Sequence, residues 1–360
     1  MKILAFESSC DETSAAVVVR EGEKFVVKSN IIASQVDTHK LYGGVVPEIA
    51  SRAHIEAISS ITYEALEKAE MTLDDIDAVA VTANPGLIGA LLVGVNFAKA
   101  LAIANGKPLI PVDHIKGHIA TCYLDTDGNA PTPPFIALTV SGGHTGIYLV
   151  EDYRKVKLIG STRDDAMGES FDKIGRIIGI PYPAGKGFDA LSREGFCEVV
   201  GECDDYLQKY KKSAEYKSGA FTLPSPAVKD DSFDFSFSGL KTAAINLLHR
   251  YEQLGEELPK ARFAARYTFE AVEAVAKKMG MAIDAYGVGQ IALCGGVAAN
   301  SHLRNRLRTL AREKKVAFYT PPVSLCGDNA AMIGAQAYYE YLDGNLADSS
   351  LNACASDSID

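Results

Sequence analysis

Two histidines four residues apart are the side chains in this sequence best suited to metal chemistry. Residues Pro108–Val112 are apolar and predict a strand, and the segment that follows has a short helical pattern carrying His114 and His118. Residues four apart lie on one face of a helix, so both imidazoles can point at a single ion. The pair alone is equally consistent with two ordinary surface histidines. A metal site therefore requires at least one further ligand from elsewhere in the chain.

The residues around this pair argue against a metallopeptidase. The zinc helix of such enzymes reads His-Glu-x-x-His, and its glutamate serves as the general base. Here Ile115 follows His114, so no glutamate is placed beside the ligands.

Length and composition indicate a globular protein of about two domains. The chain has 360 residues, of which 47% are hydrophobic and 23% charged. The longest apolar stretch, residues 87–104, is interrupted by glycines, Asn96 and Lys99, so no segment is expected to span a membrane. The first residues lead directly into a predicted strand without a signal-peptide pattern, and we therefore expect a cytoplasmic protein.

Charge and cysteine usage exclude two further classes. The formal net charge is −10, which argues against tight, autonomous binding of nucleic acid. The seven cysteines are an odd number and include no Cys-x-x-Cys pair. This pattern argues against both a disulfide framework and a structural zinc site.

Strands and helices alternate along the chain, which predicts an α/β protein. Apolar runs predict strands at residues 3–6, 15–19, 25–32, 76–82 and 109–112. After the proline-rich segment 131–134 the pattern restarts: residues 135–150 again read as strand, small polar turn and strand. This weak echo, about 130 residues after the first, suggests two domains of like topology.

Three turns carry groups that can meet a phosphate or carboxylate. The hairpin tip Glu7–Ser14 is rich in hydroxyls and carboxylates, and Ser141–Gly143 exposes backbone N–H groups. The strand at residues 290–294 ends in a glycine turn that opens a helix, which suits a nucleotide. Each also has a plain structural interpretation, such as a glycine hairpin turn. Asp328 likewise reads as the N-cap of the last helix.

Taken together, the motifs closely resemble those of the TsaD family, the tRNA threonylcarbamoyladenosine transferases, in its bacterial branch. The resemblance runs from Lys2 to about Tyr341. It is carried by eight motifs in the family's order: Glu7–Thr13, Val46–Arg52, Pro85–Leu87, the pair His114 and His118, Ser141–Thr145, Gly168–Lys173, Gly295–Asn300 and Asp328–Met332.

The resemblance implies two ribonuclease-H-like domains of the actin/Hsp70/sugar-kinase type, with the active site in the cleft between them. We expect residues 1–113 and 327–345 to form the first domain, 114–326 the second with helical insertions, and 346–360 an acidic disordered tail. It also implies that His114, His118 and Asp328 bind one metal, with iron(II) expected and zinc as the alternative.

The implied reaction is transfer of threonylcarbamoyl from its adenylate, threonylcarbamoyl-AMP, to N6 of adenosine 37 in tRNAs that read A-starting codons. The adenosine amine is a weak nucleophile, and Asp11 and Glu12 are the candidate bases. Implied partners are a TsaB-like paralogue and a small TsaE-like ATPase. Matching motif positions place the adenylate substrate on Thr139, Val140, Ser141, Gly142, Gly143, Asp172, Gly185, Asp189 and Asn300.

Two positions depart from the family pattern. The metal motif usually reads His-x-Glu-Gly-His, and here Lys116 replaces the glutamate. The loop Tyr182–Lys186 differs from the usual Tyr-Pro-Gly-Gly-Pro but retains Gly185. Rival functions are an ATP-dependent phosphotransferase or ATPase, which this fold type also serves, and a nucleotide-binding scaffold without activity.

Overall fold

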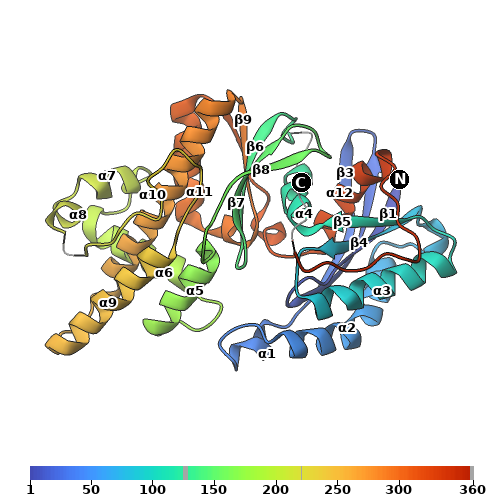
Figure 1. The fold of residues 1–360 in the computed structure, drawn as a ribbon, viewed down its shortest axis with the longest axis horizontal. Helices are drawn as coiled ribbons and strands as arrows, with labels where there is room; N and C mark the ends of the chain where they lie inside the picture. Colours follow the sequence, from blue (N-terminus) through green and yellow to red (C-terminus); the bar gives the residue numbers. More distant parts are fainter. Residues whose placement is uncertain (125–128, 220, 357–360) are drawn as a thin grey trace.

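The computed structural model describes residues 1–124, 129–219 and 221–356, and it contains two five-stranded sheets (Figure 1). Their orders are β3-β2-β1-β4-β5 and β10-β9-β6-β7-β8. In each sheet the three strands that come first in the chain pair antiparallel with one another. The two later strands then pair in parallel on one side of them. The predicted repeat of topology is therefore confirmed. The strands are β1 Lys2–Glu7, β2 Glu12–Glu21, β3 Lys24–Ser34, β4 Ala78–Asn84, β5 Leu109–Asp113, β6 Phe135–Val140, β7 Thr145–Val150, β8 Val156–Ser161, β9 Gln290–Cys294 and β10 Ala317–Tyr319.

Helices occupy three layers around the two sheets (Figure 1). Helices α2 and α3 cover the outer face of the first sheet, α5 to α11 lie beyond the second, and α4 and α12 lie between. None of the described helices is both long and apolar enough to cross a membrane. Their bounds are α1 Val36–Lys40, α2 Pro47–Lys68, α3 Ile88–Ala104, α4 His114–Ala120, α5 Met167–Ile177, α6 Gly185–Val200, α7 Tyr206–Lys212, α8 Ala214–Ser218, α9 Ser238–Leu254, α10 Lys260–Tyr286, α11 Ser301–Lys314 and α12 Ala330–Leu342.

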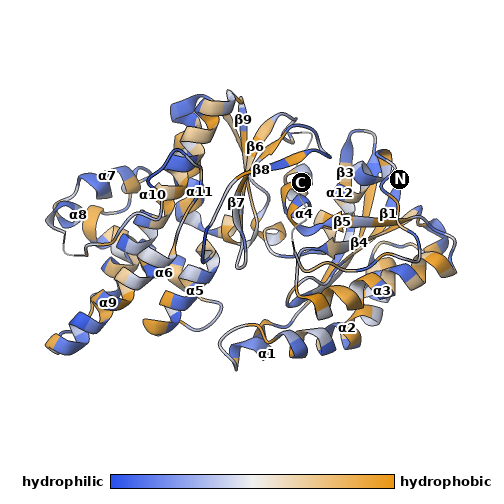
Figure 2. Cartoon of the chain, in the orientation of Figure 1, coloured by the Kyte–Doolittle hydropathy of each residue, from blue (hydrophilic) through white to orange (hydrophobic). Residues whose placement is uncertain are grey.

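The inner strands β1 and β6 are buried on both faces, which explains why they are apolar at nearly every position (Figure 2). Successive side chains of a strand point to opposite faces. In β1, Leu4 and Phe6 face α2 and α3, whereas Ile3 and Ala5 face α4 and α12. In β6, alternate residues likewise face the middle layer or the outer helices.

The middle layer forms one core with the inner faces of both sheets. Helices α4 and α12 approach closely at Gly117, where an added Cβ would lie 2.7 Å from the Cδ1 of Ile333 and 3.3 Å from the Cγ of Met332. A larger residue at this position would have to displace the end of the Ile333 side chain. Since α4 carries the two histidines and Asp328 directly precedes α12, this contact sets the spacing of the candidate metal ligands.

The C-terminal tail runs along the first sheet and contacts it, instead of extending away from the molecule (Figure 1). Ala347 bridges to Leu109, the Leu351 carbonyl accepts from Lys99 Nζ at 2.9 Å, and the Cys354 N–H donates to the Ala83 carbonyl at 2.9 Å. The expected disorder is thus wrong for the tail up to residue 356, because its small apolar residues pack against the core under α3. Residues 357–360 lie outside the described part.

Candidate metal centre and active site

His114, His118 and Asp328 come together at the junction of α4 and α12. Their ligand atoms all lie within 4.8 Å of one another, so the three residues can hold one metal ion. Asp328 Oδ1 lies 3.2 Å from His118 Nε2 and 3.7 Å from His114 Nε2. Two imidazoles and one carboxylate leave a coordination position open, as catalytic sites do.

Helix capping fixes both elements that carry these ligands. Asp113 caps α4, because its Oδ1 accepts from the N–H groups of Ile115 at 2.8 Å and Lys116 at 3.0 Å. The cap of α12 is Asn329, whose Oδ1 accepts from the Met332 N–H at 3.2 Å. The interpretation of Asp328 as that cap is therefore wrong. Since Asn329 takes the capping role, the Asp328 carboxylate is left for the histidines.

A buried glutamate orients the first histidine. Glu7, at the end of β1, is 1% exposed, and its Oε2 lies 3.0 Å from His114 Nδ1. The same oxygen accepts from Thr82 Oγ1 at 2.6 Å, and Glu7 Oε1 accepts from the Ser9 N–H at 2.5 Å. With Nδ1 directed at Glu7, His114 presents Nε2 to the cluster. Carboxylate–histidine pairs of this kind fix ring orientation in metal sites.

The charges around the cluster favour a bound cation. Burial lowers the pKa of His114, but the charges of Glu7 and Asp328 outweigh burial and raise this pKa to about 9. Burial raises the pKa of Asp328, yet the nearby His114 and His118 hold it well below its usual range. Without a metal, a proton on His114 therefore supplies the positive charge that the two carboxylates require. A divalent ion can take its place.

The surroundings of His118 show that these residues fit a metal ion. Its side chain is fully buried, and within the described residues neither ring nitrogen has a hydrogen-bond partner. The short approach of Nε2 to Asp328 has the distance of an ion pair without hydrogen-bond geometry. A buried polar group without a partner costs free energy. An ion bound to Nε2 removes that cost for this nitrogen, and the imidazole and carboxylate donors suit iron(II) or zinc.

Metal affinity is expected to rise with pH. Binding must displace the proton from His114, so below its pKa of about 9 the affinity should gain about tenfold per pH unit and then level off. Competition titration with Zn²⁺ at several pH values measures this slope. The variant Glu7→Gln removes a charge that raises this pKa, so its affinity should level off at lower pH. An affinity that did not change with pH in either protein would contradict the assignment of His114 as a ligand.

The predicted anion-binding turn lies beside the metal cluster. It joins β6 to β7, and the Ser141 N–H donates to the His144 carbonyl at 2.8 Å while Ser141 Oγ accepts from the His144 N–H at 3.0 Å. The His144 ring lies 6.4 Å from the His114 ring, centre to centre. Gly142 and Gly143 are exposed at the tip of a turn that is otherwise fixed. Thr139 and Val140 are instead fully buried in β6.

Close backbone contacts lock this turn in place. A Cβ on Gly168, at the start of α5, would lie 2.5 Å from the Ser141 carbonyl oxygen. A Cβ on Gly295 would lie 2.4 Å from the Val140 carbonyl oxygen, and Gly295 also has a φ of +88°. Both positions therefore require glycine. The motifs around Gly168 and Gly295 serve to bring the second half of the chain up to the turn.

Asp11 and Glu12 form a carboxyl pair next to the cluster. Asp11 is 9% exposed, and Glu12 opens β2 with its Oε1 accepting from Ser34 Oγ at 3.3 Å. Burial, then the charges of Asp328 and Asp11, and a hydrogen bond with Asp11 raise the pKa of Glu12 to about 9. Glu12 therefore holds a proton at neutral pH.

The remaining predicted substrate residues extend from this pair along the second half of the chain. Asp172 in α5 is near enough to Asp11 to be influenced by its charge, and Asp172 Oδ1 accepts from the Ala184 N–H at 2.7 Å. Gly185 begins α6, and Asp189 one turn later accepts from the Ser301 N–H at 2.8 Å. Asn300 caps α11, accepting from the Leu303 N–H at 2.9 Å. Asp189 and Asn300 thus already serve the start of α11.

Sequence reasoning missed three residues of this region. Glu7, His144 and Tyr182 all lie in or beside recognised motifs, but none was assigned a role. Glu7 could have been found as an acid that directly ends an apolar strand. The pKa of Tyr182 is raised, first by burial and then by the charges of Asp11 and Asp172.

Ligand geometry, rather than cavity size, locates this centre. One cavity of about 490 Å³ lies between α10 and α11, where Glu270 and Lys314 line it. A second, of about 460 Å³, lies between α2 and α3. Neither is lined by the histidine cluster.

Comparison with solved structures shows the fold class. The chain superposes on full-length HypF in a phosphate- and nucleotide-bound form with a TM-score of 0.56 and 15% identity, covering 95% of this chain and 46% of HypF. The match to HypF of T. kodakarensis has a TM-score of 0.57 and 13% identity, covering 97% and 49%. The fold is thus of the actin/Hsp70/sugar-kinase type, as expected, and identities this low carry no further conclusion.

Comparison with protein families and curated proteins shows the family. The model described as TsaD, tRNA N6-adenosine threonylcarbamoyltransferase, matches residues 26–335. The proteins of that name from Clostridium botulinum (strain 657 / Type Ba4) and Lactobacillus delbrueckii subsp. bulgaricus are 48% and 47% identical. Each alignment covers 98% of this chain, with 96% of the first relative and 94% of the second. The chain therefore belongs to the TsaD family of tRNA N6-adenosine threonylcarbamoyltransferases.

Proposed function

We propose that this chain transfers the threonylcarbamoyl group from threonylcarbamoyl-AMP to N6 of adenosine 37 in tRNAs that read A-starting codons. The adenosine amine attacks the carbamoyl carbon, the bond from that carbon to the phosphate oxygen breaks, AMP leaves, and N6 loses a proton. The observation that carries the proposal is the juxtaposition of the His114, His118 and Asp328 cluster with the Ser141–Gly143 turn, in a member of this family. Such a site pairs a cation position with an exposed glycine turn.

Mass analysis of nucleosides tests this function. The chain is incubated with the adenylate, unmodified tRNA and its partners, and the tRNA is then digested. The threonylcarbamoylated adenosine is the expected product. ATP-dependent phosphorylation of an acceptor without this nucleoside would instead favour the phosphotransferase.

Iron(II) is the ion we propose for the cluster, with zinc as the alternative. Mixed nitrogen and oxygen donors with an open position suit both. When bound, the ion supplies a Lewis acid that polarises the carbonyl or neutralises the leaving AMP. Metal analysis of the protein purified without added ions distinguishes the two.

The chain's own groups bind and orient the adenylate and accept the proton that leaves N6. The N–H groups of Gly142 and Gly143 face the phosphate and carbamoyl oxygens, and Ser141 holds their turn in shape. We assign the role of general base to Asp11. The neighbouring Glu12 already holds a proton at neutral pH, and its hydrogen bond with Asp11 keeps the two carboxyl groups together. Asp11 would accept the proton that leaves N6.

The adenosine part of the adenylate is proposed to lie along the second domain. Asp172 lies on α5, Gly185 and Asp189 lie on α6, and Asn300 caps the start of α11. This placement supports a cleft between a first domain of residues 1–113 with 327–345 and a second of residues 114–326. Thr139 and Val140 would shape the site through the β6 backbone, because their side chains are buried.

We propose a TsaB-like paralogue and a small TsaE-like ATPase as the protein partners. We also propose that the chain acts on tRNA in the cytoplasm. The chain is acidic overall, so partner surfaces would assist tRNA binding. We place the paralogue on the apolar groove between α2 and α3, where Ile55 is 64% exposed. Uncovered apolar surface of this kind marks interaction sites. Its further lining residues are Ile58, Ser59, Leu92, Val93, Asn96 and Phe97.

A charge in the groove is expected to weaken the paralogue complex. Ile55→Glu would bury a carboxylate in the interface and should lower affinity by at least about tenfold, as measured by sedimentation or calorimetry. Ile103→Glu is the matched control, since Ile103 is 60% exposed on α3 but does not line the groove. Equal affinities for both variants would move the interface elsewhere.

A further inference from the structure

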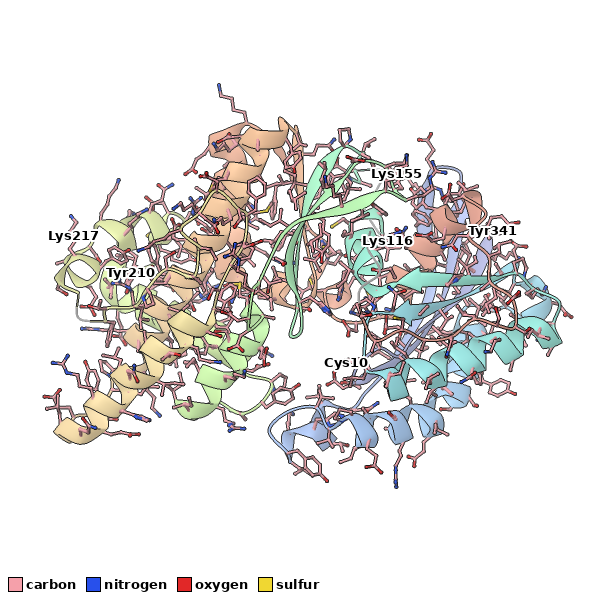
Figure 3. All side chains as sticks on the ribbon, in the orientation of Figure 1. Cys10, Lys116, Lys155, Tyr210, Lys217 and Tyr341 are labelled. Carbon is pink, nitrogen blue, oxygen red and sulfur yellow. The ribbon has the colours of Figure 1, made fainter. Side chains whose placement is uncertain are left out.

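Lys116 lies on the metal-ligating helix but points away from the ligands. Its Nζ donates to the Arg154 carbonyl at 3.2 Å and to Glu340 Oε1 at 3.4 Å. Figure 3 shows Lys116 between the two halves of the molecule, close to Lys155 of the turn that follows β7. Lys116 therefore takes part in a contact between α4, α12 and the second sheet, and not in the metal cluster itself.

The ion-pair partner of Lys116 is the buried carboxylate of Glu340, which requires a counter-charge. Glu340 is 4% exposed and also accepts from Gln336 Nε2 at 2.9 Å and Asn345 Nδ2 at 2.9 Å. Among the described residues, Lys116 is the cation that lies within ion-pair distance of Glu340. A buried carboxylate left without its counter-charge is strongly destabilising. The pair thus holds α4 to the last turns of α12.

The turn that joins β7 to β8 is held by the same helix. The Tyr153 ring stacks on Tyr339 at 4.2 Å with 12° between the planes, and Gln336 Nε2 donates to the Tyr153 carbonyl at 3.1 Å. Arg154 Nη1 donates to Asp343 Oδ1 at 2.8 Å. From α4, Lys116 contacts both sides of this group, through the Arg154 carbonyl in the turn and Glu340 in α12.

Strand β7 connects this turn to the active site. One end of the strand leads into the Ser141–His144 turn, and the other leads into the turn that carries Tyr153 and Arg154. Its six residues span about 20 Å and pair with β6 on one side and with β8 on the other, where the register shifts between Ile147 and Tyr148. Fixing one end of β7 against α4 and α12 therefore fixes the position of the other end relative to His114 and Asp328.

We propose that Lys116 and Glu340 form a latch that positions the metal ligands and the Ser141–Gly143 turn. Helix α4 has only seven residues and gains little stability by itself, so its placement depends on such contacts. Lys116 is thus a positioning residue that acts through α4. This inference builds on the proposed metal centre but concerns ion affinity, which is measurable without the transfer reaction.

Charge reversal and charge exchange test the latch. Lys116→Glu is expected to lower Zn²⁺ and Co²⁺ affinity by about 10- to 100-fold, because the new carboxylate would face Glu340. Glu340→Lys should have a similar effect. The double variant with the charges exchanged should recover at least about tenfold of the loss, which a merely structural role for either residue would not produce. Lys116→Met keeps the aliphatic stem and serves if a reversed charge prevents folding.

A second ion pair provides the matched control. Arg306 is half-buried on α11 and pairs with Glu273 at 2.5 Å, away from the cluster. Arg306→Glu should lower the melting temperature while leaving ion affinity unchanged. Wild-type ion affinity in Lys116→Glu and Lys116→Met, or no recovery in the exchanged pair, would overturn the latch. Because ion affinity decides the matter, an inactive wild type would count against the proposed function and not against the latch.

Discussion

Replacing Asp328 by alanine is expected to remove the metal and to lower the rate of threonylcarbamoyl transfer by about 10³-fold or more. Asp328 lies 3.2 Å from His118 Nε2 and supplies the one carboxylate in the cluster of three. A Lewis-acid ion contributes several kcal/mol of transition-state stabilisation, and each 1.36 kcal/mol is about tenfold in rate. Metal content and single-turnover transfer, measured on the same preparations, check both parts of this expectation.

Asn329→Ala is the control that separates ligand from helix cap. Asn329 caps α12 and is fully buried, so its loss should cost at least about 1 kcal/mol of stability, while His114, His118 and Asp328 remain to hold the metal with a much smaller loss than in Asp328→Ala. If Asp328 acted only as a cap, Asp328→Ala would cost stability and retain the metal. Metal retained in Asp328→Ala would therefore contradict the centre.

Asp11→Asn is expected to lower transfer by about 10²- to 10⁴-fold, whereas Glu12→Gln should retain most of the rate. The reason is the raised pKa of Glu12, about 9, which leaves it protonated and donating to Asp11 at neutral pH. A glutamine amide can still donate that hydrogen bond. An asparagine at position 11 can accept no proton from N6.

The pH profile distinguishes the two carboxyl groups further. Below the raised pKa Glu12 keeps its proton, and above about 9 it ionises beside Asp11 and loses its donor. Wild-type transfer should therefore fall above about pH 9, and Glu12→Gln should lack that decline. An inactive Glu12→Gln with an active Asp11→Asn would exchange the assigned roles.

Much of the fold could be predicted because each half of the chain repeats one pattern. Apolar runs of strand length, each followed by a polar or glycine turn, mark β1, β4, β5, β6 and β9. The motifs lie at the ends of these strands, where side chains can meet. The ligands His114, His118 and Asp328 could be named from the family resemblance, and the structure brings them together.

The rest depended on contacts between residues far apart in the sequence. Lys116 and Glu340 are 224 positions apart, and Glu7 and His114 are 107 apart. No local pattern relates such pairs, because α12 returns to the first sheet only after the second is complete. The sequence predicts the cap of α12 one residue too early for a different reason: Asp and Asn are both strong caps, and only the geometry shows which of the two side chains accepts from the helix N–H groups.

The most direct test of the metal-centred reaction is transfer by the chain with its partners, before and after metal removal. Chelated wild type should form no threonylcarbamoylated adenosine, and adding iron(II) or zinc should restore the product. Chelated and reconstituted Asp328→Ala should form none. Product formed at the full rate by metal-free wild type, with metal content verified on the same sample, would contradict a reaction centred on His114, His118 and Asp328.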